Sequence, residues 1–155
     1  MKEEKARVIA QLQADWQAVK DLMDSVPRSR LLEPGVLDDW SAKDLMGHIA
    51  TWEEVGIDRV RKLRAGEEIV RPYPDINAFN ARESARKSDL SLEEIEGQFV
   101  DTHSRLVEAL ENLPDRFFLP QPQPPQTAAA LTLRHCKQHA EDLRKWLKSI
   151  ENSRP

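Results

Sequence analysis

The sequence lacks several features that mark particular classes of protein. It has one cysteine, Cys136, so an intramolecular disulfide framework is excluded. No apolar run approaches the roughly 20 residues that a membrane-spanning helix needs, so we expect no membrane association. Residues 1–16 alternate charged and apolar side chains with a helical period, which is typical of neither a signal peptide nor a transit peptide. We therefore expect a cytoplasmic protein.

A basic surplus is also missing, because the formal net charge at pH 7 is −4. Proteins that bind the phosphate backbone of nucleic acids usually carry an excess of Lys and Arg, so we expect no nucleic-acid partner. The 155 residues, 39% hydrophobic and 32% charged, have the size and composition of one domain with its own core. We assign that domain to residues 1–151 and expect residues 152–155 to form a frayed tail.

Apolar residues recur with the helical period in four long segments of the chain. These segments span residues 3–26, 41–65, 91–112 and 126–150. Ser41 precedes Asp44 by three residues, which is the spacing of a capping box at the start of the second segment. Ser91 and Glu94 have the same spacing at the start of the third. No segment has the pattern of a strand, so the sequence predicts an all-α four-helix bundle.

Two connections between the predicted helices are unusually long for such a bundle. Residues 66–88 contain the extended stretch RPYP, followed by a short helix that Asp75 would cap and that carries Ile76 and Phe79. Residues 113–125 end in QPQPP, which favours a stiff, polyproline-like conformation. The first connection therefore adds a short helix outside the four long ones.

The histidines fall on the apolar faces of the predicted helices. His135 and His139 are four residues apart, so they project from one face of a helix, about 6 Å apart along its axis. His48 lies on the apolar stripe of the second segment. Three imidazoles from two helices can hold one metal ion and leave positions open for water or substrate, as in catalytic zinc sites.

The alternative for each histidine alone is a core residue that makes one hydrogen bond. Burying several imidazoles together without a ligand would leave ring nitrogens unpaired, at a cost of about 1–3 kcal/mol for each group. The joint pattern therefore favours a metal site at His48, His135 and His139. His103 lies on the apolar stripe of the third segment. We expect it to line the pocket or to hydrogen-bond one of the metal-binding residues, rather than to bind the metal as a fourth ligand.

Imidazole ligands suit several metals. Zinc is the expected ion, with nickel, manganese and iron as alternatives. Such a site could lower the pKa of bound water to about 7, or deprotonate a thiol. The general base is missing, because Glu53 and Glu54 follow His48 by five and six residues and so lie far round the helix. Cys136, beside His135, is expected to be a small apolar filler rather than a nucleophile.

The long connection at residues 66–88 carries polar side chains that could serve the same site. One hypothesis is that this connection closes one mouth of the bundle near the metal, where Tyr73, Asn77 or Asn80 would contact a ligand. The alternative is a surface loop whose polar side chains meet only water.

Several stretches resemble one family. Residues 40–52, WSAKDLMGHIATW, resemble the start of the second helix of the DinB-like superfamily, a group of damage-inducible, metal-dependent four-helix bundles. Residues 135–144, HCKQHAEDLR, are similar to its last helix, which carries two metal-binding histidines four residues apart. INAFN at 76–80 and THSRL at 102–106 look most like the subgroup named for DfsB and colibactin-resistance proteins. The likeness follows nearly the whole chain in order and spacing.

This resemblance implies a four-helix bundle with a long crossover after the second helix, and metal ligands at His48, His135 and His139. Related proteins include thiol transferases that use bacillithiol or mycothiol and a maleylpyruvate isomerase, so a small thiol is an implied partner. DinB-like bundles often dimerise, which implies a homodimer here. The resemblance specifies the fold better than the reaction, because one fold carries many functions.

Three functions follow from these patterns. The first is a metal-dependent transferase or hydrolase that acts on a small electrophilic or thiol-linked substrate in detoxification or stress response. The second is a bundle that binds a small molecule without turnover. The third is a structural or dimerisation module with a dry, filled core. The sequence does not name the substrate.

Overall fold

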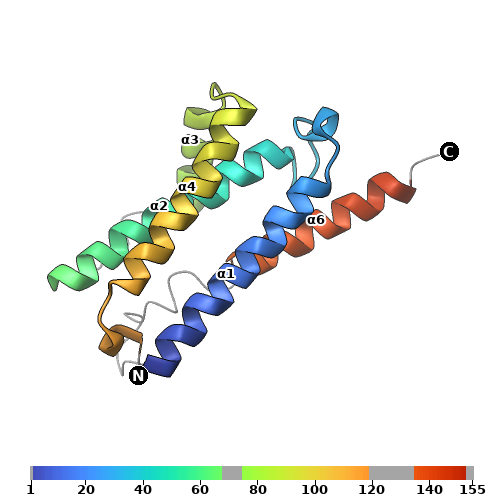
Figure 1. Ribbon diagram of the computed structural model, residues 1–155. Helices are drawn as coiled ribbons and strands as arrows, with labels where there is room; N and C mark the ends of the chain where they lie inside the picture. Colours follow the sequence, from blue (N-terminus) through green and yellow to red (C-terminus); the bar gives the residue numbers. More distant parts are fainter. Residues whose placement is uncertain (1, 68–74, 119–134, 153–155) are drawn as a thin grey trace.

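The computed structural model describes residues 2–67, 75–118 and 135–152. Over these ranges the chain forms five α-helices, two short 3-10 helices and no strand (Figure 1). The α-helices are α1 (Lys2–Ser25), α2 (Ala42–Ala65), α3 (Ile76–Lys87), α4 (Leu92–Glu111) and α6 (His135–Asn152), and the 3-10 helices are η1 (Arg28–Arg30) and η2 (Asp115–Phe118). The predicted all-α class is confirmed. No helix of this described part is long and apolar enough to cross a membrane.

Helices α2 and α4 begin at the two predicted capping boxes. The Ser41 hydroxyl accepts a hydrogen bond from the Asp44 backbone N–H at 3.1 Å, and the Asp44 carboxylate accepts one from the Ser41 N–H at 2.9 Å. Ser91 and Glu94 form the same pair of bonds, at 3.1 and 3.0 Å. Both helix starts are therefore fixed by residues of their own segment.

The four long helices pack against one another around the core. Helix α2 lies along α4 and α1 lies along α6, and contacts of α1 with α4 and of α2 with α6 join the two pairs (Figure 1). The described part of the fourth predicted segment begins at His135, and its helix runs on to Asn152. Residues 126–134, the QPQPP stretch and residues 153–155 of the predicted tail lie outside the described residues.

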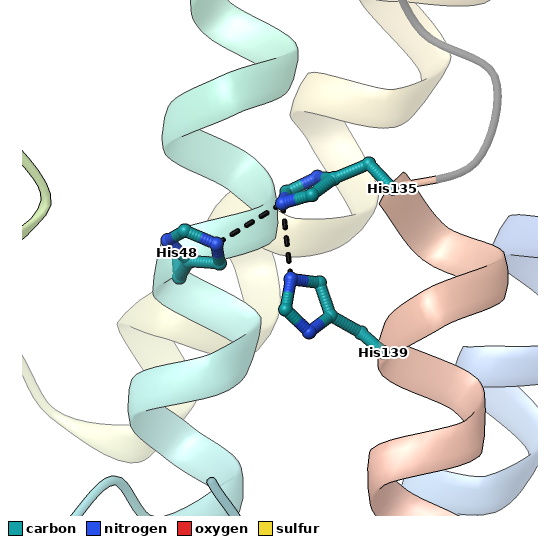
Figure 2. Close-up of side chains that lie close together, drawn as sticks. All are labelled: His48, His135 and His139. Carbon is teal, nitrogen blue, oxygen red and sulfur yellow. Dashed lines mark hydrogen bonds between the residues drawn. The ribbon is translucent and has the colours of Figure 1, made fainter. Parts of the chain in front are cut away.

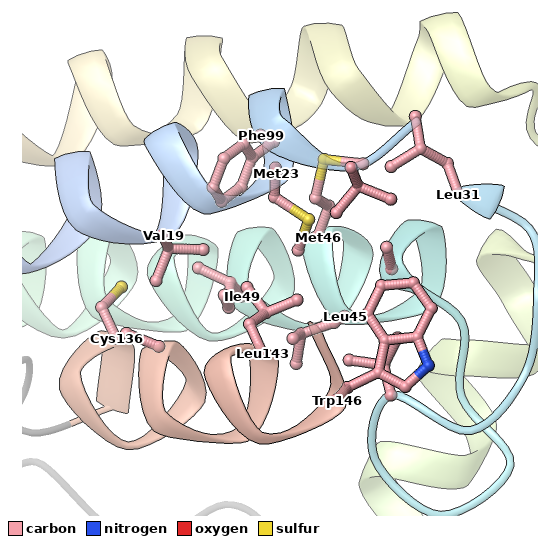
Figure 3. Close-up of a cluster of buried hydrophobic side chains, with 14 of the residues drawn as sticks. Val19, Met23, Leu31, Leu45, Met46, Ile49, Phe99, Cys136, Leu143 and Trp146 are labelled. Carbon is pink, nitrogen blue, oxygen red and sulfur yellow. The ribbon is translucent and has the colours of Figure 1, made fainter. Parts of the chain in front are cut away.

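The buried apolar side chains form two separate clusters. The first contains Leu45, Phe99 and Leu143, each at most 1% exposed (Figure 3). The second lies toward the other end of the helices; it is built from Val8, Ile9, Leu12, Val60, Leu63, Leu106, Val107, Leu110, Leu113 and Phe118. Between the two clusters, α2 carries Glu53 and α4 carries His103, both buried. We call this pair and the cavity beside it the polar layer.

Helix α3 packs on α2 as the short additional helix that the sequence predicts. Asp75 caps it, with its carboxylate accepting a hydrogen bond from the Ala78 N–H at 3.0 Å. Phe79 is buried, with its ring centroid 5.2 Å from that of Trp52. The Trp52 indole N–H donates to the Asn80 amide oxygen at 2.8 Å. These contacts hold α3 against the part of α2 that follows His48.

Candidate metal centre

Three histidines from two helices converge on one point, as Figure 2 shows. His48 extends from α2, and His135 and His139 extend from the first turns of α6. The Nε2 atom of His135 lies 3.0 Å from the Nε2 atoms of both His48 and His139. One nitrogen from each ring lies within 4.8 Å of the other two. The structure thus brings together the three residues that the sequence singled out.

Hydrogen bonding alone cannot satisfy these nitrogens. An imidazole nitrogen offers either one N–H or one lone pair, so His135 Nε2 can form only one well-directed hydrogen bond with its two neighbours. The Nδ1 atom of His139 lies 3.1 Å from the Asp142 carboxylate, which accepts but does not donate. His139 therefore carries its proton on Nδ1, and its Nε2 presents a lone pair to the cluster.

Burial keeps the rings uncharged. Desolvation, with a smaller contribution from the neighbouring imidazoles, lowers the pKa of His48 and of His135 to about 3. Burial also lowers the pKa of His139, although Asp142 opposes that shift. Neutral imidazoles are the form that binds a metal ion.

The spacing of the nitrogens suits a divalent cation. Zinc–nitrogen bonds of about 2.0–2.1 Å at tetrahedral angles place two ligand nitrogens about 3.3 Å apart, close to the 3.0 Å contacts around His135. Histidines that bind metal usually donate their other ring N–H to a carboxylate or carbonyl, as His139 does to Asp142. The cluster could therefore hold a metal ion, and the ligand set does not choose among zinc, nickel, manganese and iron.

A cavity of about 380 Å³ adjoins the three histidines. Besides His48, His135 and His139, its lining consists of Leu12, Trp52, Glu53, Arg59, Ile76, Asn80, Leu106 and Cys136. Its volume lies in the range of small-molecule sites, about 300–1,000 Å³. The cluster thus faces a space that can take a small ligand.

Glu53 is the functional candidate that the sequence reasoning discarded. It is 5% exposed and lines the cavity together with His48, although it follows His48 by five residues. Its carboxylate oxygens lie 3.1 and 3.3 Å from Nδ1 of His103. Burial raises the pKa of Glu53, and His103 opposes the shift. The available signal was its position four residues after Ile49 and seven before Val60, on the buried stripe of α2.

His103 lies beside the metal cluster without joining it. Its ring stacks on Trp16 with centroids 4.2 Å apart and an angle of 4° between the planes. Its contact with Glu53 links it to the cavity wall. Among the described residues, the group of potential ligands contains only the other three histidines.

The other predicted residues take different positions. Asn80 lines the cavity, with its amide oxygen bonded to Trp52. Asn77 is exposed and is not part of the lining, and Tyr73 lies outside the described residues. Cys136 lines the cavity within the first apolar cluster, and burial raises the pKa of its thiol. The thiol is therefore protonated, in agreement with the predicted filler role.

Fold and cavity together define a chain whose described part is helical, with a histidine cluster at the wall of a cavity. The sequence model of the DinB superfamily matches residues 6–143. The chain therefore belongs to the DinB superfamily, as the resemblance indicated. No curated protein matches it in sequence.

Solved structures share this fold at low sequence identity. One is the colibactin self-resistance protein ClbS in complex with double-stranded DNA, with a TM-score of 0.80, 15% identity, and coverage of 93% of this chain and 95% of that one. An uncharacterised protein from Escherichia coli UTI89 has a TM-score of 0.78 and 14% identity, covering 95% and 94% of the two chains. A protein from Streptococcus pneumoniae has a TM-score of 0.76 and 12% identity, covering 93% and 90%.

The ClbS complex corrects one expectation. The net charge of −4 led us to expect no nucleic-acid partner, and that inference is wrong, because a protein of this fold is found in complex with double-stranded DNA. A net charge sums over the whole surface, whereas binding depends on how charge is distributed locally. Overall acidity therefore does not exclude nucleic acid for this fold.

Proposed function

We propose that this protein is a metal-dependent transferase or hydrolase that acts on a small electrophilic or thiol-linked substrate in detoxification or stress response. The observation that carries the proposal is the convergence of three neutral imidazoles on a cavity that also contains a buried carboxyl group. We further propose that α1, α2, α4 and α6 form a DinB-like four-helix bundle, with α3 in the crossover after α2.

Each part of the site has a separate role in this proposal. His48, His135 and His139 would hold the metal, and Asp142 keeps the proton of His139 on Nδ1, away from the cluster. A divalent ion there would act as a Lewis acid that lowers the pKa of a bound water or thiol. Leu12 and Leu106 line the cavity with apolar surface, which limits the access of water to the reacting groups.

Glu53 is the proposed proton acceptor. His103 can donate its Nδ1–H to one carboxylate oxygen, which orients the group and supports its negative charge. Burial raises the pKa of Glu53, which makes the carboxylate a stronger base than one in water. In the proposed step the proton of the attacking water or thiol passes to a Glu53 oxygen, and the nucleophile forms its bond to the electrophilic centre of the substrate. The bond to the leaving group breaks with its electron pair, and the leaving group takes up the proton from Glu53.

Metal analysis of tag-free protein tests the ligand set. The wild type should contain near-stoichiometric metal, whereas His48→Ala, His139→Ala and the double variant should lose it and still fold. His103→Ala is the matched control, because it removes a buried imidazole that contacts Glu53 instead of the cluster. Stoichiometric metal in the double variant would reject the site.

The role of Glu53 is tested separately, with a conservative variant. Glu53→Gln keeps the size of the side chain and removes its basicity, so metal content should stay at the wild-type level. Turnover of an electrophile such as 1-chloro-2,4-dinitrobenzene with a small thiol should fall by about 10²–10⁴-fold. Full activity in this variant would rule out Glu53 as the base. Normal metal content with no turnover of any electrophile by the wild type would favour the non-catalytic binding alternative.

Duplex DNA is a second candidate ligand, supported by the complex of ClbS, which shares this fold. We would titrate a fluorescently labelled duplex with wild-type protein at low and at physiological salt. Binding that weakens as salt rises is expected for phosphate contacts. Absence of binding at low salt would remove DNA as a partner of this chain.

A further inference from the structure

Arg59 brings a positive charge to the cavity wall. It lies on α2, is half-buried, and lines the same cavity as the three histidines. Its Nε atom is enclosed and has no hydrogen-bond partner in the described part of the chain. Within residues 2–67, 75–118 and 135–152 the Arg59 side chain forms no ion pair, whereas the nearby Arg61 contacts both Asp58 and Glu67.

The Nε–H of Arg59 is thus a buried donor without an acceptor among the described residues. A guanidinium carries a positive charge, so its burial is costly unless an acceptor lies within reach. Buried donors in native proteins nearly always have an acceptor, and a charged donor without one is destabilising. Among the residues that line the cavity, Glu53 carries the carboxylate, and this carboxylate contacts His103. A ligand that fills the cavity could therefore supply an acceptor for the Arg59 guanidinium.

The position of Arg59 defines the shape of such a ligand. Arg59 follows His48 by eleven residues, which is about 16 Å along the helix axis. Apolar side chains of Leu12 and Leu106 also line this cavity. A molecule that reaches both ends is elongated and apolar in its middle, and carries its anionic group away from the histidines.

We propose that the cavity binds a small carboxylic acid with an apolar body, whose carboxylate pairs with Arg59 and whose other end lies at the histidine cluster. The planar guanidinium fork matches the two oxygens of a carboxylate. That the ligand reacts at its histidine end rests on the proposed function, because the reaction there requires a bound metal. The Arg59 contact itself requires no metal.

Calorimetric titration with octanoate and with octanamide tests the contact, because the two molecules differ mainly in charge. Wild-type protein should bind octanoate about tenfold or more tightly than octanamide. Arg59→Gln should lose this preference, and Arg59→Lys should keep part of it. Arg61→Gln is the matched control, because it removes the same group from an exposed position on the same helix. This control should behave like the wild type.

Repeating the titrations after chelation separates this inference from the metal proposal. A preference for octanoate that survives chelation and disappears in Arg59→Gln supports the Arg59 contact, whether or not the protein binds metal. The opposite result would be a preference for octanoate that Arg59→Gln keeps and chelation removes. It would place the carboxylate at the metal and overturn the inference. Equal binding of octanoate and octanamide by the wild type would also overturn it.

Discussion

Replacing Asp142 with alanine tests whether the histidine cluster is a metal site held in one protonation state. The Asp142 carboxylate lies 3.1 Å from Nδ1 of His139 and accepts a hydrogen bond from it. Without that acceptor, the proton can move to Nε2, the atom that faces His135 at 3.0 Å. A protonated Nε2 has no lone pair for a metal, so the variant must expend free energy to restore the binding tautomer.

The structure sets the size of this effect. Removing the outer hydrogen-bond partner of a metal-binding histidine typically weakens metal binding by about 10–100-fold, which is about 1.4–2.7 kcal/mol. The Asp142 side chain is 21% exposed, so water can replace part of its hydrogen bond. We therefore expect Asp142→Ala to lie near the lower end, at about a tenfold loss of affinity.

Competition with a chromophoric chelator, using tag-free protein and zinc at neutral pH, measures this affinity directly. Glu141→Ala is the control, because it removes the same charge from the neighbouring, exposed position on α6. Asp142→Asn keeps an acceptor oxygen and should lose less affinity than Asp142→Ala. Equal losses of metal affinity in Glu141→Ala and Asp142→Ala would mean that the effect comes from removing a nearby negative charge, and not from the hydrogen bond to His139. Wild-type affinity in Asp142→Ala would refute the role of the hydrogen bond.

Three further predictions concern stability. Gly97 is exposed within α4, and the position that a Cβ would take there is open. Gly97→Ala should therefore raise the free energy of unfolding, measured by urea denaturation, by about 0.5–1 kcal/mol. A loss of stability would contradict this. Burial lowers the pKa of Lys87 from 10.5. Just below pH 10.5 the unfolded chain therefore binds more protons than the folded one, so the contribution of Lys87 to the free energy of unfolding rises with pH in that window. Lys87→Met should remove that rise when urea curves at neutral pH and about pH 10 are compared, and an unchanged slope would exclude Lys87 as its source. Trp52→Phe removes the bond to Asn80, so amides of α3 should exchange hydrogen faster while those of α4 do not; equal protection in both proteins would count against that anchor.

The sequence predicted local features well because they depend on residues close together in the chain. The capping boxes at Ser41 and Ser91 involve pairs three residues apart, and both occur where expected. His135 and His139 share a helix face because they are four residues apart. That His48 faces them depends on the packing of α2 on α6, which the family resemblance suggested and periodicity alone did not.

Long-range pairing is what the sequence did not predict. The spacing from His48 predicts no role for Glu53, because it lies far round the helix, although Glu53 falls on the buried stripe of α2. Its partner His103 is fifty residues away, so no local pattern joins them. Arg59 also escaped notice, because an arginine in a helix is usually a solvated residue. In each case the buried setting of a charged side chain follows from tertiary packing.

The polar layer lies between the two apolar clusters, and its cavity is lined by residues from both of them. Cys136, beside the histidine end of the cavity, belongs to the first cluster, whereas Leu12 and Leu106 in the wall belong to the second. Substitutions in clusters that share no contacts change stability nearly additively. The second cluster can therefore be repacked to accept a new ligand body while the histidines stay in place. If the proposed function holds, such a division lets one scaffold be adapted to different ligands, by evolution or by design, with the histidine cluster left intact.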